Sequence, residues 1–307
     1  MKSKTWSALL ALYFIWGSTY LAIRLVVESM PPFLSAGLRF LIAGAILFIW
    51  RRLAGEKVPT IRQWRSAGIV GLLLLLGGNG LVSWAEQFVP SGIAALIIGS
   101  IPIWLVLLEA LRPGGAKPGR LAILGLIAGF IGIAVLIGPA EFGGNQEIKP
   151  IGMVALLAAA LFWAIGSIYS RGADLPGSAL MTNGTEMLVG SLGLLAVSGL
   201  TGEWSHFQPE AVSRQSWIGL IYLITFGSLI GFSAYAWLLR NAPVSLVATY
   251  AYVNPIVAVL LGSWLADETI NARIIIAATI IIGSVILINT SQRRPSASTS
   301  SAAEIAD

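Results

Sequence analysis

Ten long apolar runs follow one another along this chain, and they limit its fold more than any other feature. Each has close to the ~20 residues that a helix needs to cross the hydrocarbon layer of a membrane. Only 11% of the 307 residues are charged, against about 25% in soluble domains. The sequence therefore predicts an all-α membrane protein with ten transmembrane helices. The runs lie at about 6–27, 33–50, 66–85, 91–111, 120–138, 151–170, 179–200, 215–239, 244–265 and 272–289.

Lysine and arginine are spread unevenly over the two sides that ten spans would define. The opposite side from the N-terminus holds only Lys149, Arg214 and Arg273, with Arg24 near a helix end. Positive residues accumulate in cytoplasmic loops, so we expect a protein of the cell inner (plasma) membrane with both termini in the cytoplasm. The residues on the predicted cytoplasmic side are Lys2, Lys4, Arg51, Arg52, Lys57, Arg62, Arg65, Arg112, Lys117, Arg120, Arg171, Arg240, Arg293 and Arg294.

The two halves of the sequence resemble each other. Residues 74–108 match residues 227–261 at an offset of 153, with ten identities that include tryptophan and proline pairs. Residues 14–24 resemble residues 161–171 at an offset of 147. Because each half has an odd number of spans, the second half enters the membrane from the other side, which is typical of secondary transporters. The predicted units are a five-helix repeat at 1–145, an inverted five-helix repeat at 146–290 and a disordered cytoplasmic tail at 291–307.

Each half places a proline inside an apolar run at the same position. Pro102 lies in "GSIPIW" and Pro255 in "YVNPIV". Proline removes a backbone hydrogen bond from a helix, and paired interrupted spans indicate a binding site near the middle of the membrane. We therefore expect both prolines to break their helices beside a solute site. The alternative is a kink that serves helix packing alone.

Polar and aromatic side chains gather on the same runs. Some of these rings are expected in the belts at the membrane surface, but those near the centres of runs are less easily explained in that way. A buried amide in hydrocarbon needs a partner, and a cavity with aromatic walls would suit a partly apolar solute. The predicted substrate-binding residues are Trp16, Ser18, Tyr20, Asn79, Trp84, Trp163, Tyr169, Tyr235, Trp237, Tyr250 and Asn254.

Ionisable residues inside the runs are few. Arg39 and Glu186 occupy corresponding places in spans two and seven, and Glu268 lies near the end of span nine. Intramembrane charges are often functional, so these three are candidates for charge coupling; snorkelling or pairing with loops is the alternative. The chain has no cysteine and one histidine. Neither a catalytic set nor a metal site or cofactor motif follows from the sequence.

Several motifs resemble the EamA-type branch of the drug/metabolite transporter superfamily. They are "FIWGSTYLAIR", "GGNGLVSWAEQFVPSGIAALI", "SIPIW", "YAWLLRNAPVSLVATYAYVNPIVAVLLGSWLADETI" and "GSVILI", and the resemblance covers roughly residues 6 to 290. It implies ten helices and a central cavity lined mostly by spans one, three, four, six, eight and nine. It also implies export of small metabolites, often amino acids or related compounds, or drugs, by alternating access. The first half departs from the pattern, since "LLEALRPGG" has no acid where the second half has Glu268.

The predicted function is export of a small amphiphilic solute across the inner membrane by a monomer that binds no nucleic acid. One alternative is a transporter of nucleotide sugars or lipid-linked sugars, for which Arg39 is the single intramembrane cation. Another is a membrane-embedded transferase, which needs paired acids at midplane depth, where only Glu186 comes close. A structural or sensor protein is a third, although it has no reason to keep two matched interrupted helices.

Overall fold

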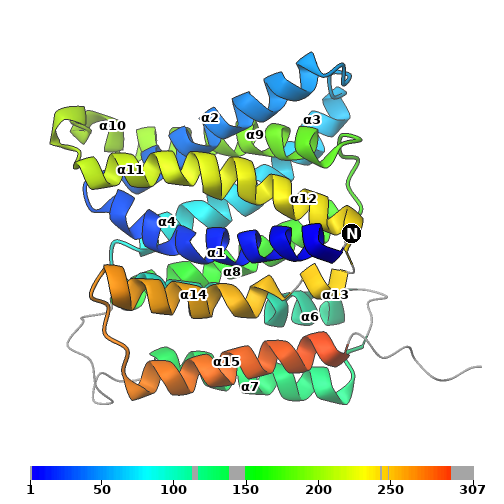
Figure 1. Ribbon diagram of the computed structural model, residues 1–307, viewed down its shortest axis with the longest axis vertical. Coiled ribbons are helices and arrows are strands. Elements are labelled where there is room, and N and C mark those ends of the chain that lie inside the picture. Colours follow the sequence, from blue (N-terminus) through cyan, green and yellow to red (C-terminus); the bar gives the residue numbers. More distant parts are fainter. Residues whose placement is uncertain (1, 113–116, 138–148, 243, 248, 292–307) are drawn as a thin grey trace, which may run out of the picture.

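The computed structural model describes residues 2–112, 117–137, 149–242, 244–247 and 249–291. Within these ranges the regular elements are all helical, and most run side by side along one direction (Figure 1). The predicted repeat boundary at 145/146 and the predicted tail beyond residue 291 lie outside the described residues. The first-half elements are α1 (Lys2–Val27), α2 (Pro32–Leu53), α3 (Ile61–Gly71), η1 (Leu72–Gly80), α4 (Leu81–Ala85), α5 (Ser91–Ile98), α6 (Ile101–Leu111) and α7 (Arg120–Ile137). The second-half elements are α8 (Pro150–Ser170), α9 (Ala179–Leu200), α10 (Glu203–His206), η3 (Pro209–Ala211), α11 (Arg214–Tyr222), η4 (Leu223–Ile230), α12 (Gly231–Asn241), α13 (Val244–Val247), α14 (Tyr250–Leu265) and α15 (Ala272–Ser291).

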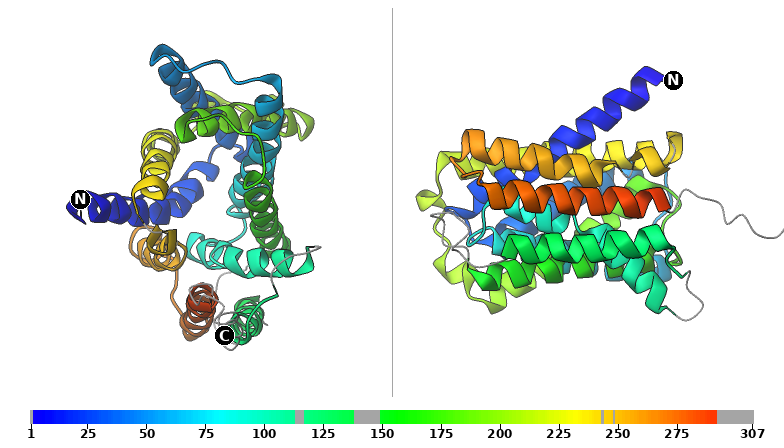
Figure 2. Two further views of the ribbon diagram at one scale, coloured as in Figure 1. Left: turned by 90° about the vertical axis from the view of Figure 1, so that its right-hand side faces the viewer. Right: turned by 90° about the horizontal axis from the view of Figure 1, so that it is seen from below.

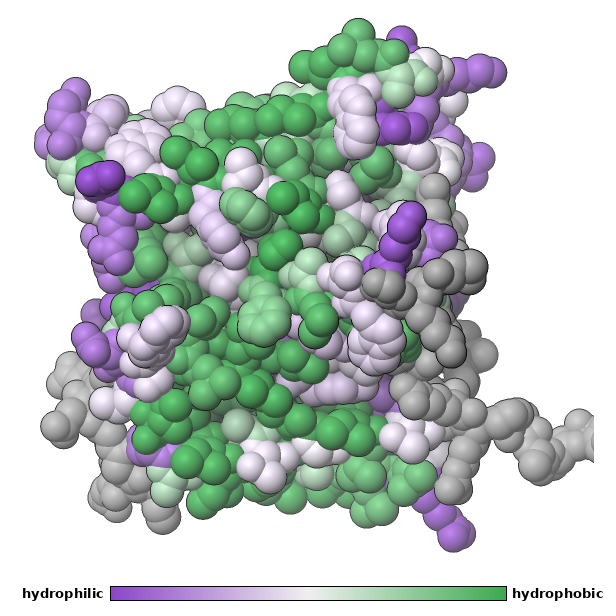
Figure 3. Space-filling model, in the orientation of Figure 1, coloured by the Kyte–Doolittle hydropathy of each residue, from purple (hydrophilic) through white to green (hydrophobic). Residues whose placement is uncertain are grey.

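Nine helical segments of the described chain are long and apolar enough to cross a membrane. They coincide with nine of the predicted runs, when consecutive elements such as α3, η1 and α4 are taken as one segment. The remaining run contains α13 and the 16-residue α14, which is shorter than the ~20 residues of a full span. Figure 3 shows a broad hydrophobic surface between two hydrophilic ends. A multi-span membrane protein follows, and the count of ten spans stays a prediction.

The helix pair α7 and α15 lies at one edge of the bundle (Figure 2). A Cβ added at Gly125 would lie 2.8 Å from Cγ1 of Ile288, and one added at Gly132 would lie 2.8 Å from Cγ1 of Ile281. The contact moves down α15 as it moves up α7, so the two helices run antiparallel. Glycine allows this close approach because small residues let helix backbones come together in a membrane.

The helix pair α2 and α9 makes the equivalent contact near the opposite edge. A Cβ at Gly37 would lie 2.7 Å from Cδ2 of Leu195, and one at Gly44 would lie 2.8 Å from Cβ of Met187. These helices are therefore also antiparallel. In both pairs one helix comes from the first half of the chain and the other from the second.

Two segments in the middle of the bundle are π-helices rather than α-helices. They are η1, between α3 and α4, and η4, between α11 and α12. At the offset of 153 that relates residues 74–108 to residues 227–261, η1 overlaps η4. π-Helical segments are rare and often mark functional sites. They contain Gly78 and Gly227, which contact the tryptophans of the candidate site.

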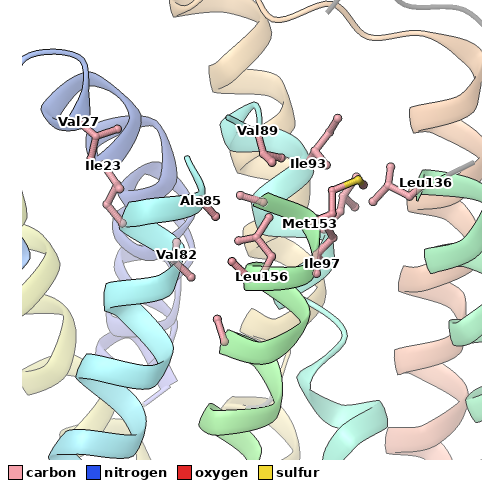
Figure 4. Close-up of a cluster of buried hydrophobic side chains, with 14 of the residues drawn as sticks. Ile23, Val27, Val82, Ala85, Val89, Ile93, Ile97, Leu136, Met153 and Leu156 are labelled. Carbon is pink, nitrogen blue, oxygen red and sulfur yellow. The ribbon is translucent and has the colours of Figure 1, made fainter. Parts of the chain in front are cut away.

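Part of the largest buried cluster joins α1, α4, α5 and α8 (Figure 4). Ile23, Val82 and Ile97 are among its fully or almost fully buried members. We call the end of the bundle that carries α10, formed by residues 28–31, 86–90, 201–213 and 266–271, the α10 end. The core fixes α1 against α4 and α5, and so positions the first-half residues of the site.

Candidate functional site

An aromatic cluster surrounds Trp16 in the middle of α1. Its ring lies 5.4 Å from Phe232, 5.2 Å from Tyr235 and 5.3 Å from Tyr250, measured between ring centroids. The indole Nε1–H donates a hydrogen bond to the carbonyl oxygen of Gly227 at 3.3 Å. Three of the predicted residues, Trp16, Tyr235 and Tyr250, are thus brought together from α1, α12 and α14. Phe232 joins them and was not among the predicted residues.

Two tryptophans are in close contact with glycines of the other half of the chain. A Cβ at Gly231 would lie 2.5 Å from Nε1 of Trp16, and a Cβ at Gly78 would lie 2.9 Å from Cε3 of Trp163. Both distances are shorter than real Cβ contacts, so only glycine fits without displacement. Trp16 corresponds to Trp163 and Gly78 to Gly231 in the internal alignment. The same contact is therefore made twice, with the halves exchanged.

The two spans that contain the predicted prolines contact each other. In the first half the break lies at Gly99 and Ser100, and Pro102 is the second residue of the following helix α6. In the second half the structure differs from the sequence prediction, because α14 continues through Pro255 and begins five residues before it. A Cβ at Gly99 would lie 3.0 Å from Cγ of Pro255. The proline of one half therefore packs against the break of the other.

Asn254, beside that proline, is 6% exposed. Its amide donates to the carbonyl oxygens of Tyr13, at 3.3 Å, and Tyr250, at 3.2 Å, in the orientation that satisfies both groups. A Cβ at Gly17 would lie 3.2 Å from the Asn254 carbonyl oxygen, so α1 and α14 are in close contact here. The structure gives Asn254 a role in joining these helices, which is a different use of the amide from the predicted contact with solute.

Three other predicted residues lie beside the first-half π-helix and the buried core. Asn79 donates from Nδ2 to the carbonyl of Leu74 at 3.4 Å, within η1. Trp84 meets Phe88 edge to face at 5.1 Å, and both Trp84 and Tyr20 pack against the largest buried cluster. These residues lie further toward the α10 end than the Trp16 cluster.

Three predicted residues are not brought to either group. Ser18 shares its hydroxyl with Tyr222, at 2.6 Å, and both line an outer groove of about 640 Å³ between α1, α11 and α14. Tyr169 and Trp237 are each 38% exposed. The reason is helix geometry, since residues two apart point in nearly opposite directions. Ser18 and Trp237 are each two residues from a member of the Trp16 cluster.

Arg39 is a buried cation on α2. Its side chain is 4% exposed, its Nε donates to Oγ of Ser228 on η4 at 2.9 Å, and the guanidinium lies 4.6 Å from the centre of the Phe40 ring. Glu186 on α9 is also buried. In the described part of the chain neither residue forms an ion pair.

Glu268 is placed across the boundary between the two halves. Its carboxylate accepts from the backbone N–H groups of Ser91, at 2.6 Å, and Gly92, at 3.0 Å. These are the first two amides of α5, which have no partner inside their own helix. A Cβ at Gly262 would lie 2.4 Å from this carboxylate. Glu268 therefore caps a first-half helix at the α10 end, and we call this contact the Glu268 cap.

A second carboxylate repeats the arrangement. Glu203, on α10, accepts from the backbone N–H groups of Phe33, at 3.3 Å, and Leu34, at 2.8 Å, in the first turn of α2. Sequence reasoning did not single out Glu203. The prolines in "PPFL" and "VPSG" do indicate helix starts, because proline is frequent there. They do not indicate which distant acid caps each helix. We call this contact the Glu203 cap.

Glu86 lies between the two halves at the same end. It is fully buried, and neither carboxylate oxygen has a hydrogen-bond partner among the described residues. Arg24 donates to the main-chain carbonyl of Glu86 and not to its carboxylate. A buried carboxyl group without a partner is costly when charged. Its burial depends on elements that are distant in the chain, so the sequence alone does not single out Glu86.

Comparisons with known proteins identify the family of this chain. The model of the EamA-like transporter family matches residues 4–138 and again residues 150–290. The inner membrane transporter YedA of Escherichia coli is 41% identical over 282 residues, which cover 92% of this chain and 89% of that protein. The transporter YvbV of Bacillus subtilis is 26% identical, covering 95% and 93%. A solved crystal structure aligns with a TM-score of 0.62 at 24% identity over 94% of this chain and 96% of that one, which shows a shared fold.

The chain forms a bundle of apolar, membrane-length helices, and one transporter family model matches it twice. These features define the protein as a multi-span membrane transporter. The chain belongs to the EamA-like transporter family, within the drug/metabolite transporter superfamily. The resemblance seen in the sequence is thereby confirmed. A multi-pass protein of the inner membrane with a role in transport follows from these relatives.

Proposed function

We propose that this chain exports small amphiphilic metabolites, such as amino acids or related compounds, by alternating access. The observation that carries the proposal is the exchanged pair of contacts, Trp16 on Gly231 and Trp163 on Gly78. The two contacts place a tryptophan at the corresponding position of each half, and each tryptophan lies against a glycine of the other half. Aromatic side chains combine a large apolar face with a polar atom, which suits a solute that is partly apolar.

Movement of the two halves against each other supplies the alternating access in this proposal. The antiparallel pairs α2 with α9 and α7 with α15 support it, as does the contact between the first-half break at Gly99 and Pro255 of the second half. An inverted repeat of two five-helix units accounts for all three observations. The excess of Lys and Arg on one side supports cytoplasmic termini, with the α10 end on the outer side.

Removal of the Trp16 ring tests the binding role. In liposomes, we expect Trp16→Ala to reduce counterflow of labelled L-phenylalanine about 10- to 100-fold, because a buried aromatic contact contributes roughly 1.5–3 kcal/mol. Trp163→Ala should act similarly. Trp6→Ala is the matched control, since Trp6 lies on the same helix and is 52% exposed. Equal losses in all three variants would contradict the assignment of the site.

A further inference from the structure

Arg39 is a cation without a counter-ion. The guanidinium is buried within a membrane segment, and none of the carboxylates in the described ranges forms an ion pair with it. Its Nε donates a hydrogen bond to a neutral hydroxyl, that of Ser228. A buried charge is normally paired, because taking it out of water is expensive. The protein thus keeps an unpaired positive charge where it is costly to do so.

The guanidinium borders a small enclosed space. A cavity of about 10 Å³ lies between α1, α2, α4 and the α11–η4 segment, and its polar lining residues are Arg39, Ser35 and Ser83. In this conformation it has room for about one water molecule. Three polar side chains from two first-half helices therefore converge on one point, within apolar walls from α1 and α11.

Arg39 is also next to the aromatic cluster. A Cβ at Gly227 would lie 3.1 Å from Nη2 of Arg39 and 3.1 Å from Cγ2 of Thr19. The carbonyl of the same glycine accepts the Trp16 hydrogen bond. The cation and Trp16 thus contact the same residue of η4, and a ligand that met both would need an anionic group beside an apolar body.

We infer that Arg39 is the group that recognises a carboxylate on the transported solute. The inference rests on the proposed function and deepens it by naming the substrate class as monocarboxylates with an aromatic or aliphatic body, amino acids included. Arginine presents a planar fork of donors that matches a carboxylate with two parallel hydrogen bonds. A phosphate group fits less well, because its larger charge calls for more than one cation. The carboxylate enters when α2 and η4 separate and the cavity widens.

Binding to the purified full-length protein tests the inference without a known substrate. The probes are 3-phenylpropionate and the uncharged 3-phenylpropanamide, which share the same apolar body. We expect the acid, and not the amide, to raise the thermal unfolding midpoint of the unaltered protein. Arg39→Gln should weaken binding of the acid about 10- to 100-fold, as expected for loss of charge-assisted hydrogen bonds. Arg62→Gln, at a side chain that is 82% exposed, should leave the binding unchanged.

A second variant separates recognition from a purely structural role. Without ligand, Arg39→Met should unfold at a midpoint no lower than that of the unaltered protein, because removing an unpaired buried charge relieves its desolvation cost. A clearly lower midpoint would point to a structural arginine and overturn the inference. Equal protection by acid and amide, protection by neither, or undiminished protection of Arg39→Gln by the acid would overturn it as well. Counterflow of phenethylamine without binding of the acid would keep the proposed function while removing this inference.

Discussion

In the alternating-access cycle proposed above, replacing Glu268 with alanine is expected to make the α10 end open more readily. The Glu268 cap supplies two hydrogen bonds from a carboxylate to backbone amides of α5. Hydrogen bonds to charged groups contribute about 1.5–3 kcal/mol each, so loss of both shifts the balance between closed and open conformations by roughly 100-fold or more. The removed side chain joins the two halves, so its loss acts on their relative position rather than on one helix alone.

The absence of cysteine from the chain makes this change measurable. A single reporter, Ser35→Cys, places one thiol at a side chain that is 3% exposed and lines the Arg39 cavity. A water-soluble maleimide should label this thiol about 100-fold faster in the Glu268→Ala background, while Glu210→Ala, at an exposed acid of the same end, should leave the rate unchanged. Indistinguishable rates in the two backgrounds would show that the cap does not hold the α10 end closed.

Adding one methyl group at Gly71 is expected to separate α3 from α9. A Cβ there would lie 2.2 Å from the carbonyl oxygen of Glu186 and 3.1 Å from its Cα. The contact is reciprocal, because a Cβ at Gly190 would lie 2.8 Å from the carbonyl oxygen of Gly71. Backbone atoms cannot rotate away as a side chain does, so we expect Gly71→Ala to cost roughly 3 kcal/mol, at the upper end of overpacking effects.

The measurement is thermal unfolding of the purified protein in detergent, followed by tryptophan fluorescence. Gly283→Ala is the matched control, since Gly283 also lies in a helix, α15, and an added Cβ there meets nothing within 4 Å. It should leave stability unchanged or raise it by about 0.5–1 kcal/mol through helix propensity. If both variants unfold at the same temperature, the close crossing of α3 and α9 is not required for stability.

Span positions could be predicted well from the sequence, because length and apolar content alone decide whether a helix can cross a membrane. The α8 helix, predicted at 151–170, begins one residue earlier and ends at the predicted residue. The break near Pro255 was placed less well. Pro255 lies inside α14 and removes one of its backbone hydrogen bonds, while Asn254 beside it ties this part of α14 to α1. Such compensation depends on a neighbouring helix.

The residues that meet in the candidate site could be predicted only in part. Trp16 and Ser18 stand two residues apart, and the sequence alone does not say which of them faces Tyr235 and which faces the outer groove. The π-helices add to the difficulty, because they change the angular spacing of the residues that follow them. Phe232 and Glu203 could not be found for a different reason. Their partners lie on other helices, and no local pattern encodes those contacts.

The two caps also set an order of events during synthesis. The Glu268 cap joins residues 177 positions apart, and the Glu203 cap joins residues about as distant. At about 5–20 residues per second of translation, the first amides of α5 wait roughly 10 to 35 s before Glu268 is made. Until then they have only water and lipid headgroups as partners. The newly made first half is therefore an incomplete intermediate. If translation stopped between the two halves, the first amides of α2 and α5 would have no carboxylate to cap them.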